Sequence, residues 1–165
     1  MDPVHESVTI DRPREEVFTY LADVANHSEF SDHYLTHWHL TRPDSFGRGA
    51  GARFRVEVPC QRFDWGDMTL VVVEAPHRIV ALGRYGKFNR IKTTAIWTLD
   101  VAPGGGTEVE YMFEAEPALR SDKFMETVSG QRGWFKRKVR KSLRRLQAIL
   151  EENEDRGARV TVAGL

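Results

Sequence analysis

Hydrophobic and polar residues alternate along this chain with two periods, and the longest helical pattern lies near its C-terminus. Residues 121–155 are predicted to form one amphipathic helix, because at about 100° per residue the apolar side chains share one stripe. The stripe holds Phe124, Val128, Phe135, Val139, Leu146, Ile149 and Leu150. The other side carries Lys136, Arg137, Arg140, Lys141, Arg144 and Arg145. So long an apolar stripe has to be buried, so we expect the helix to pack against a sheet.

The N-terminal part predicts a strand followed by helices. Val4, Val8 and Ile10 alternate with polar residues, which is typical of a strand. Pro13 is expected in the first turn of a helix of about three turns, where its missing N–H has no cost. The apolar stripe of that helix consists of Val17, Phe18, Leu21 and Val24. Residues 26–33 are expected to form a shorter helix or a structured loop.

From residue 35 the period changes to two, which predicts six further strands. The first surrounds Trp38 and Leu40, and the second contains Phe54, Val56 and Val58, with Pro59 ending regular pairing or marking a bulge. The others span residues 63–74, 78–85, 91–101 and 107–115. Short connections between consecutive strands imply an antiparallel sheet. We therefore predict an α+β fold, in which a curved sheet of about seven strands wraps the C-terminal helix.

The length and composition indicate one soluble domain. Residues 1–155 are assigned to the domain and residues 156–165 to a flexible tail. The net charge is zero, so no overall field favours nucleic acid or membranes. The single cysteine, Cys60, excludes an internal disulfide and suits a reducing compartment. The longest aliphatic run, residues 70–73, is far too short to span a membrane, and the N-terminus lacks signal-peptide features. A cytoplasmic location is therefore expected.

Three stretches of the chain resemble a known superfamily. They are VTIDRPREEVFTYLADVANHSEF, the hairpin IWTLDVAPGGGTEVEYMFEAE and the C-terminal helix. The chain is similar to the START-like (SRPBCC) superfamily of polyketide cyclases and lipid-transport proteins, which has the helix-grip fold of birch-pollen allergen. The matching positions of the opening are Pro13, Val17-Phe18 and Leu21-Ala22-Asp23, whereas Phe30 stands where many relatives have tryptophan.

The resemblance implies two short helices between the first two strands, and commonly an internal cavity. Members are lipid and steroid carriers, quinone-binding proteins, aromatase/cyclases and ribosome-association factors, and no catalytic motif is common to them all. The resemblance therefore indicates the fold more specifically than the activity.

The last hairpin suggests where a cavity would lie. With a turn at residues 104–106, its inner face has large aromatic side chains at one end and two alanines at the other. The expected pairs are Val101 with Val109, Leu99 with Tyr111, Trp97 with Phe113, and Ala95 with Ala115. The alanine end leaves space unless Phe124 or Phe135 packs there as ordinary core. The family resemblance favours the cavity.

Candidate ligand-binding residues follow from this arrangement. Gln131 and Arg132 lie next to two helix-disfavouring glycines, and we expect one of them to face the cavity mouth. The alternative is a loosened first turn with both side chains in water. The full candidate set is Phe54, Val56, Val58, Ala95, Trp97, Tyr111, Phe113, Ala115, Gln131, Arg132 and Phe135.

Other motifs predict little chemistry. The histidines His27, His33, His37 and His39 are close in sequence, but only Asp32 is an evident additional ligand, so we expect no metal site. The glycines of residues 47–51 precede a strand rather than a helix, which argues against dinucleotide binding and favours a flexible entrance loop. Cys60 is expected to be a buried thiol rather than a nucleophile. No catalytic constellation or cofactor site is visible.

The basic face of the C-terminal helix places like charges four residues apart, which is unfavourable for stability alone. One interpretation is contact with an anionic surface, such as RNA, lipid headgroups or an acidic partner. The residues that would make this contact are Arg137, Arg140, Lys141 and Arg144. The other interpretation is a solvated face compensated by carboxylates of the sheet edge.

Three functions follow. The favoured one is binding or carrying of a hydrophobic small molecule, such as a lipid, quinone or polyketide, because cavity features are visible and catalytic ones are not. The second is an enzyme of the polyketide aromatase/cyclase type, with an acid or base supplied by Tyr111, Arg132 or a histidine. The third is an interaction protein that uses the basic helix face. The sequence determines neither the ligand nor the oligomeric state.

Overall fold

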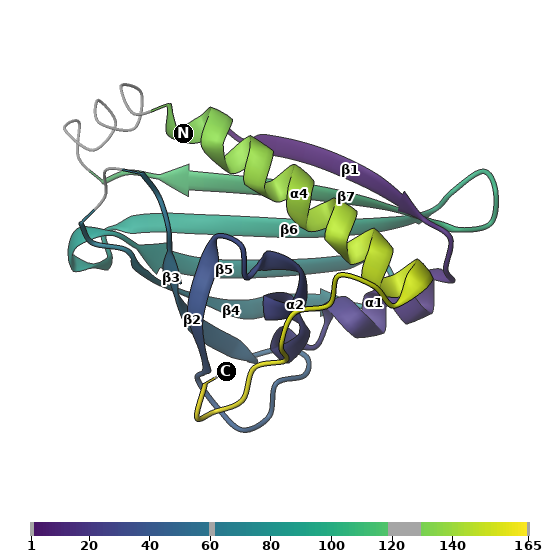
Figure 1. Cartoon of the computed structure of the whole chain (residues 1–165), viewed down its shortest axis with the longest axis horizontal. Coiled ribbons are helices and arrows are strands. Elements are labelled where there is room, and N and C mark those ends of the chain that lie inside the picture. Colours follow the sequence, from purple (N-terminus) through teal and green to yellow (C-terminus); the bar gives the residue numbers. More distant parts are fainter. Residues whose placement is uncertain (1, 60–61, 119–129, 165) are drawn as a thin grey trace.

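The computed structural model describes residues 2–59, 62–118 and 130–164 of the chain (Figure 1). Its sheet is antiparallel, with seven strands in the order β1-β7-β6-β5-β4-β3-β2. The strands are β1 Val4–Ile10, β2 Leu35–Leu40, β3 Gly51–Val56, β4 Trp65–Glu74, β5 Arg78–Tyr85, β6 Ile91–Val101 and β7 Thr107–Glu116. The predicted helix-grip arrangement is confirmed, since short helices connect β1 to β2 and one long helix crosses the sheet.

The long helix α4, Gln131–Glu152, buries its predicted apolar stripe. Phe135, Val139, Leu146 and Ile149 belong to the core, together with Leu143. The expected start of this helix at residue 121, including Phe124 and Val128, lies outside the described residues. No helix in the described parts of the chain is long and apolar enough to cross a membrane.

The helical segment before β2 is more divided than the sequence predicts. It contains α1 Arg14–Leu21, the short 3-10 helix η1 Val24–Asn26 and α2 His27–Ser31. Helix α1 is shorter than three turns, because the Asp23 side chain accepts a hydrogen bond from Ala25 N (3.1 Å) and thereby caps η1. Pro13 occupies the capping position just before α1 rather than its first turn.

The predicted register of the β6–β7 hairpin is wrong by two residues. Trp97 lies opposite Tyr111, and Ala95 lies opposite Phe113. The turn occupies residues 102–106, closed by a hydrogen bond from Ala102 N to Gly106 O (2.8 Å), so it is centred one residue earlier than expected. A shift of two keeps the same side chains on the inner face. Its consequence is that Ala95 faces Phe113 and has Ala81 of β5 as its other neighbour.

The C-terminal residues 156–164 lie beside α2 and the edge strand β2 (Figure 1). Val160 is buried, and its N–H donates to Ala25 O (3.1 Å). Leu40 N donates to Thr161 O (3.2 Å), so part of the exposed edge of β2 is covered. The flexibility expected for this tail stays a prediction.

Ion pairs join the same segment to the helices before β2. Arg156 pairs with the buried Glu29 at 3.2 Å, and Arg159 pairs with Asp23. Tyr20 donates a hydrogen bond to Glu29 (2.8 Å), which supplies the carboxylate with a second partner. The tail therefore holds the short helices against the rest of the molecule.

Candidate ligand-binding site

A pocket of about 90 Å³ is bounded by the sheet on one side and by α4 on the other. A water molecule needs roughly 10–15 Å³ of such space, so several waters would fit. The helical side consists of Phe135, Val139, Ser142 and Leu143 of α4, and of His27, Phe30, Ser31 and Tyr34 from α2 and the turn after it. Most of the boundary is apolar, as in typical small-molecule sites.

Small residues on β5 and β6 create this space. Ala81 pairs with Ala95, and Gly83 pairs with Thr93, so four small side chains form one continuous patch of the pocket boundary. Only Ala95 was among the candidate residues. The missed residues had a signal in the sequence, since Ala81 and Gly83 are small residues two positions apart on one predicted strand and therefore share a face of it.

Aromatic rings form the walls of the pocket. The ring centroids of Phe113 and Phe135 lie 5.0 Å apart, and those of Trp97 and Tyr111 lie 4.9 Å apart. Phe135 thus packs near Ala95, as the core-packing alternative expected, and a pocket is nevertheless present beside it. Seven of the eleven candidate residues border the pocket, namely Phe54, Val56, Ala95, Trp97, Tyr111, Phe113 and Phe135.

The other four candidates lie elsewhere. Val58 and Ala115 are buried in the core without bordering the pocket. Gln131 is buried at the first turn of α4, and the exposed Arg132 donates to Pro3 O (3.4 Å) in the N-terminal segment. Neither is among the residues that border the pocket, so a place for one of them at its mouth stays a prediction.

His27 is a neutral polar group on the pocket boundary. Its Nε2–H donates to Leu21 O (2.7 Å), and complete burial lowers the pKa of the imidazole. The ring therefore stays neutral, with Nδ1 as a hydrogen-bond acceptor. The edge of the imidazole contacts Trp97, with 5.2 Å between ring centroids.

Several hydroxyl groups also border the pocket, and we call three of them, those of Tyr34, Tyr111 and Ser142, the hydroxyl cluster. Burial raises the pKa of Tyr34 to about 12, although the nearby Ser142 hydroxyl acts in the opposite direction. Burial, with a contribution from Tyr34, raises the pKa of Tyr111 well above its usual range. Ser142 Oγ is buried and has no hydrogen-bond partner within the described residues. Three separate elements thus bring neutral polar groups to one region.

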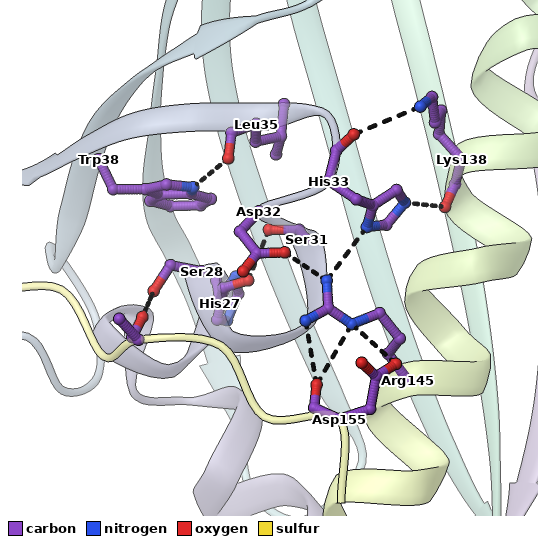
Figure 2. Close-up of polar contacts among 11 residues, drawn as sticks. His27, Ser28, Ser31, Asp32, His33, Leu35, Trp38, Lys138, Arg145 and Asp155 are labelled. Carbon is purple, nitrogen blue, oxygen red and sulfur yellow. Dashed lines mark hydrogen bonds and ion pairs between the residues drawn. The ribbon is translucent and has the colours of Figure 1, made fainter. Parts of the chain in front are cut away.

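A polar network attaches the α2 segment to α4 (Figure 2). The buried Arg145 contacts Asp32, and its Nη2 donates to Asp155 O (3.0 Å). His33 Nε2 donates to Lys138 O (3.2 Å), and Lys138 Nζ donates back to His33 O (3.3 Å). Burial lowers the pKa of His33 to about 4, and the neighbouring cations act in the same direction. The network positions α2 beside the pocket.

The basic face of α4 is partly neutralised. Arg145 was expected on this face, but it points towards α2 and is buried, because that side of α4 packs against the loop that carries Asp32. Glu6 of β1 accepts two hydrogen bonds from Arg140 (3.1 and 3.0 Å) and lies 3.8 Å from Lys136. A carboxylate of the sheet edge thus compensates part of the face. The exposed cations that remain are Arg137, Lys141 and Arg144.

Within the described residues, neither the histidine group nor the glycine-rich loop of residues 47–51 has the role that a metal site or a pocket entrance would require. No group of three potential metal ligands occurs among the residues that the structure describes. Residues 47–51, expected at the entrance, do not border the pocket. Instead, Gly47 N donates to Ala22 O (2.9 Å) and Gly49 N donates to Leu70 O (2.7 Å), which holds this loop against neighbouring elements. Cys60 lies outside the described residues.

Solved structures with the same fold come from diverse proteins. The KanY protein, solved by NMR, is 15% identical, with a TM-score of 0.71 over 90% of this chain and 96% of that one. The protein TTHA0849 from Thermus thermophilus is 14% identical, with a TM-score of 0.67 over 90% and 96%. Truncated norcoclaurine synthase from Thalictrum flavum is 11% identical, with a TM-score of 0.67 over 92% and 94%. At such identities the likeness shows the fold alone.

No curated protein gives a significant sequence match. A family model does, since the model for polyketide cyclase / dehydrase and lipid transport proteins matches residues 1–151. The match includes every strand and nearly all of α4. The chain therefore belongs to the polyketide cyclase / dehydrase and lipid transport family.

Proposed function

We propose that this protein binds or carries a hydrophobic small molecule in the pocket beneath α4, acting in the cytoplasm. The observation that carries the proposal is the patch of small residues, Ala81, Gly83, Thr93 and Ala95, which keeps apolar space open between the sheet and the helix. Large aromatic side chains surround this space and supply contact area for an apolar ligand. Membership of a family with cyclase and lipid-transport members agrees with such a ligand.

The pKa values of the pocket favour binding over acid–base catalysis. A general acid or base works best when its pKa lies near the working pH. The pKa of His27 is lowered, the pKa of Tyr34 is raised to about 12, and the pKa of Tyr111 is raised well above its usual range. Each group thus remains neutral and is a weak proton donor or acceptor at neutral pH. Arg132, the other candidate for acid–base chemistry, lies away from the pocket.

A cyclase-type enzyme of this family is the alternative, with His27 as the base and the hydroxyl cluster as proton donors. An interaction with an anionic surface would depend on Arg137, Lys141 and Arg144, since Glu6 already pairs with Arg140 and Lys136. Neither alternative has an observation as direct as the pocket itself.

Filling the pocket tests the proposal. Ala81→Leu adds three carbon atoms at a buried boundary position, and the neutral fluorescent dye N-phenyl-1-naphthylamine serves as the apolar probe. We expect saturable dye binding by the unaltered protein and about tenfold weaker binding by Ala81→Leu, because the side chain occupies the ligand's space. Ala148→Leu on α4, away from the pocket, is the matched control and should bind normally. Equal affinities of all three proteins would refute the proposal.

A further inference from the structure

The hydroxyl cluster contains a buried hydroxyl, that of Ser142, whose hydrogen-bonding capacity the packing of the core does not explain. A buried hydroxyl is normally paired, because an unpaired one loses its hydrogen bonds to water without replacement. Ser142 borders the pocket, and its buried Oγ meets the full geometry of a hydrogen bond with no group in the described part of the chain, although it lies near enough to the Tyr34 hydroxyl to oppose the rise in the pKa of Tyr34. By contrast, the hydroxyl of Ser31, which also borders the pocket, donates to His27 O at 2.5 Å. A serine hydroxyl has one donor and two acceptor sites, so Ser142 keeps hydrogen-bonding capacity for a ligand even beside the Tyr34 hydroxyl.

The charges around the pocket define what polar group would fit. Two ionisable side chains of opposite sign, Asp67 and Arg84, border the pocket as paired positions of β4 and β5. Asp67 already accepts a hydrogen bond from Arg84 N (3.1 Å). His27 is neutral, and Tyr34 and Tyr111 keep their protons at neutral pH. A charged group placed beside Ser142 would meet the neutral groups of the hydroxyl cluster there, which makes its burial costly.

We infer that the pocket selects a neutral, largely aromatic ligand with one hydroxyl or carbonyl oxygen, and that Ser142 Oγ hydrogen-bonds this oxygen. The inference rests on the proposed function, since it identifies the polar contact within the same pocket. Tyr34 stands next to Ser142 and supplies a second hydroxyl for the same oxygen. The aromatic walls hold the rest of the ligand. Ser142 is therefore a specificity-determining residue in a pocket that is otherwise mainly apolar.

Three probes with one ring system test this inference. Naphthalene has no polar group, 2-naphthol carries a hydroxyl that is neutral at pH 7, and 2-naphthoate carries a carboxylate. Dissociation constants are measured by equilibrium dialysis for the unaltered protein, Ser142→Ala and the control Ser28→Ala. The readout is the ratio of the 2-naphthol and naphthalene constants, because this ratio cancels general changes in the pocket. Thermal unfolding verifies that each variant is folded.

We expect Ser142→Ala to weaken the binding of 2-naphthol, relative to that of naphthalene, by about three- to tenfold, which is the effect of losing one hydrogen bond. Ser28→Ala should leave the ratio within about twofold, since Ser28 is not among the residues that border the pocket and its hydroxyl donates to Ala158 O (2.5 Å). The carboxylate probe 2-naphthoate should bind most weakly. An unchanged ratio in Ser142→Ala, or 2-naphthoate as the tightest ligand, would overturn the inference while leaving the proposed function intact. If none of the probes bound the folded protein, the proposed function itself would fail and the inference with it.

Discussion

Arg145→Ala tests whether the polar network in Figure 2 holds α2 onto the long helix. Arg145 has a buried side chain that contacts Asp32 and the backbone and carboxylate of Asp155. Hydrogen bonds to charged groups contribute about 1.5–3 kcal/mol each, and breaking a fully buried ion pair costs about 3–5 kcal/mol. The two carboxylates are 36% and 61% exposed, so water replaces part of the lost interaction. We therefore expect a loss of about 2–4 kcal/mol in the free energy of unfolding.

Urea unfolding measures this loss directly, and a melting curve should show a decrease of about 4–16 °C for a protein of this length. Arg144→Ala is the matched control, because the neighbouring arginine is exposed, and it should change stability by less than about 0.5 kcal/mol. Arg145→Lys should fall between the two, since lysine keeps the charge but lacks the planar fork. The reasoning is refuted if Arg145→Ala and Arg144→Ala unfold with the same free energy.

Three further predictions concern pH, the tail and the basic face. The pKa of His33 is about 4 in the folded protein and ordinarily 6.5, so its contribution to stability is complete above pH 6.5 and is lost as the pH falls towards 4. Between pH 7 and pH 4.5, urea unfolding should therefore show a smaller decline in the free energy of unfolding for His33→Gln than for the unaltered protein. An equal decline would contradict the shift in the pKa of His33. Deleting residues 156–165 should lower the free energy of unfolding by at least about 1.5–3 kcal/mol, because the burial of Val160 is lost. An unchanged urea midpoint would instead support the prediction of a flexible tail. If the basic face binds RNA, changing its three exposed cations to glutamate should abolish retention on an RNA column at low salt. Equal retention of the variant and the unaltered protein would exclude this face as the contact. The exchanged residues are Arg137, Lys141 and Arg144.

The hairpin shows how far periodicity determines a site. Alternation placed Trp97 and Tyr111 on the inner face, and both border the pocket. The same alternation is unchanged by a shift of two residues, so it did not determine which residues pair. The five-residue turn sets the register, and it moves Ala95 from the expected partner Ala115 to Phe113.

The charged residues of α4 show the opposite case, in which the local period of the sequence does not predict what a side chain contacts. Helical periodicity assigned Arg145 to a basic surface, yet a loop that is distant in sequence covers it. Nothing in the local sequence of α4 indicates this contact, because the side of a helix that α2 approaches depends on the connection between them. The same holds for Arg140, whose compensation by Glu6 involves residues 134 positions apart.

The sequence by itself determined the strands, the long helix and the family, because each depends on local period and on short motifs. The tertiary structure decided which small residues lie side by side, and therefore where the pocket is. Ala81 and Ala95 are fourteen positions apart and become neighbours only through strand pairing. The surroundings of the Ser142 hydroxyl are decided in the same way, since the polar groups around a buried side chain come from every element packed against it.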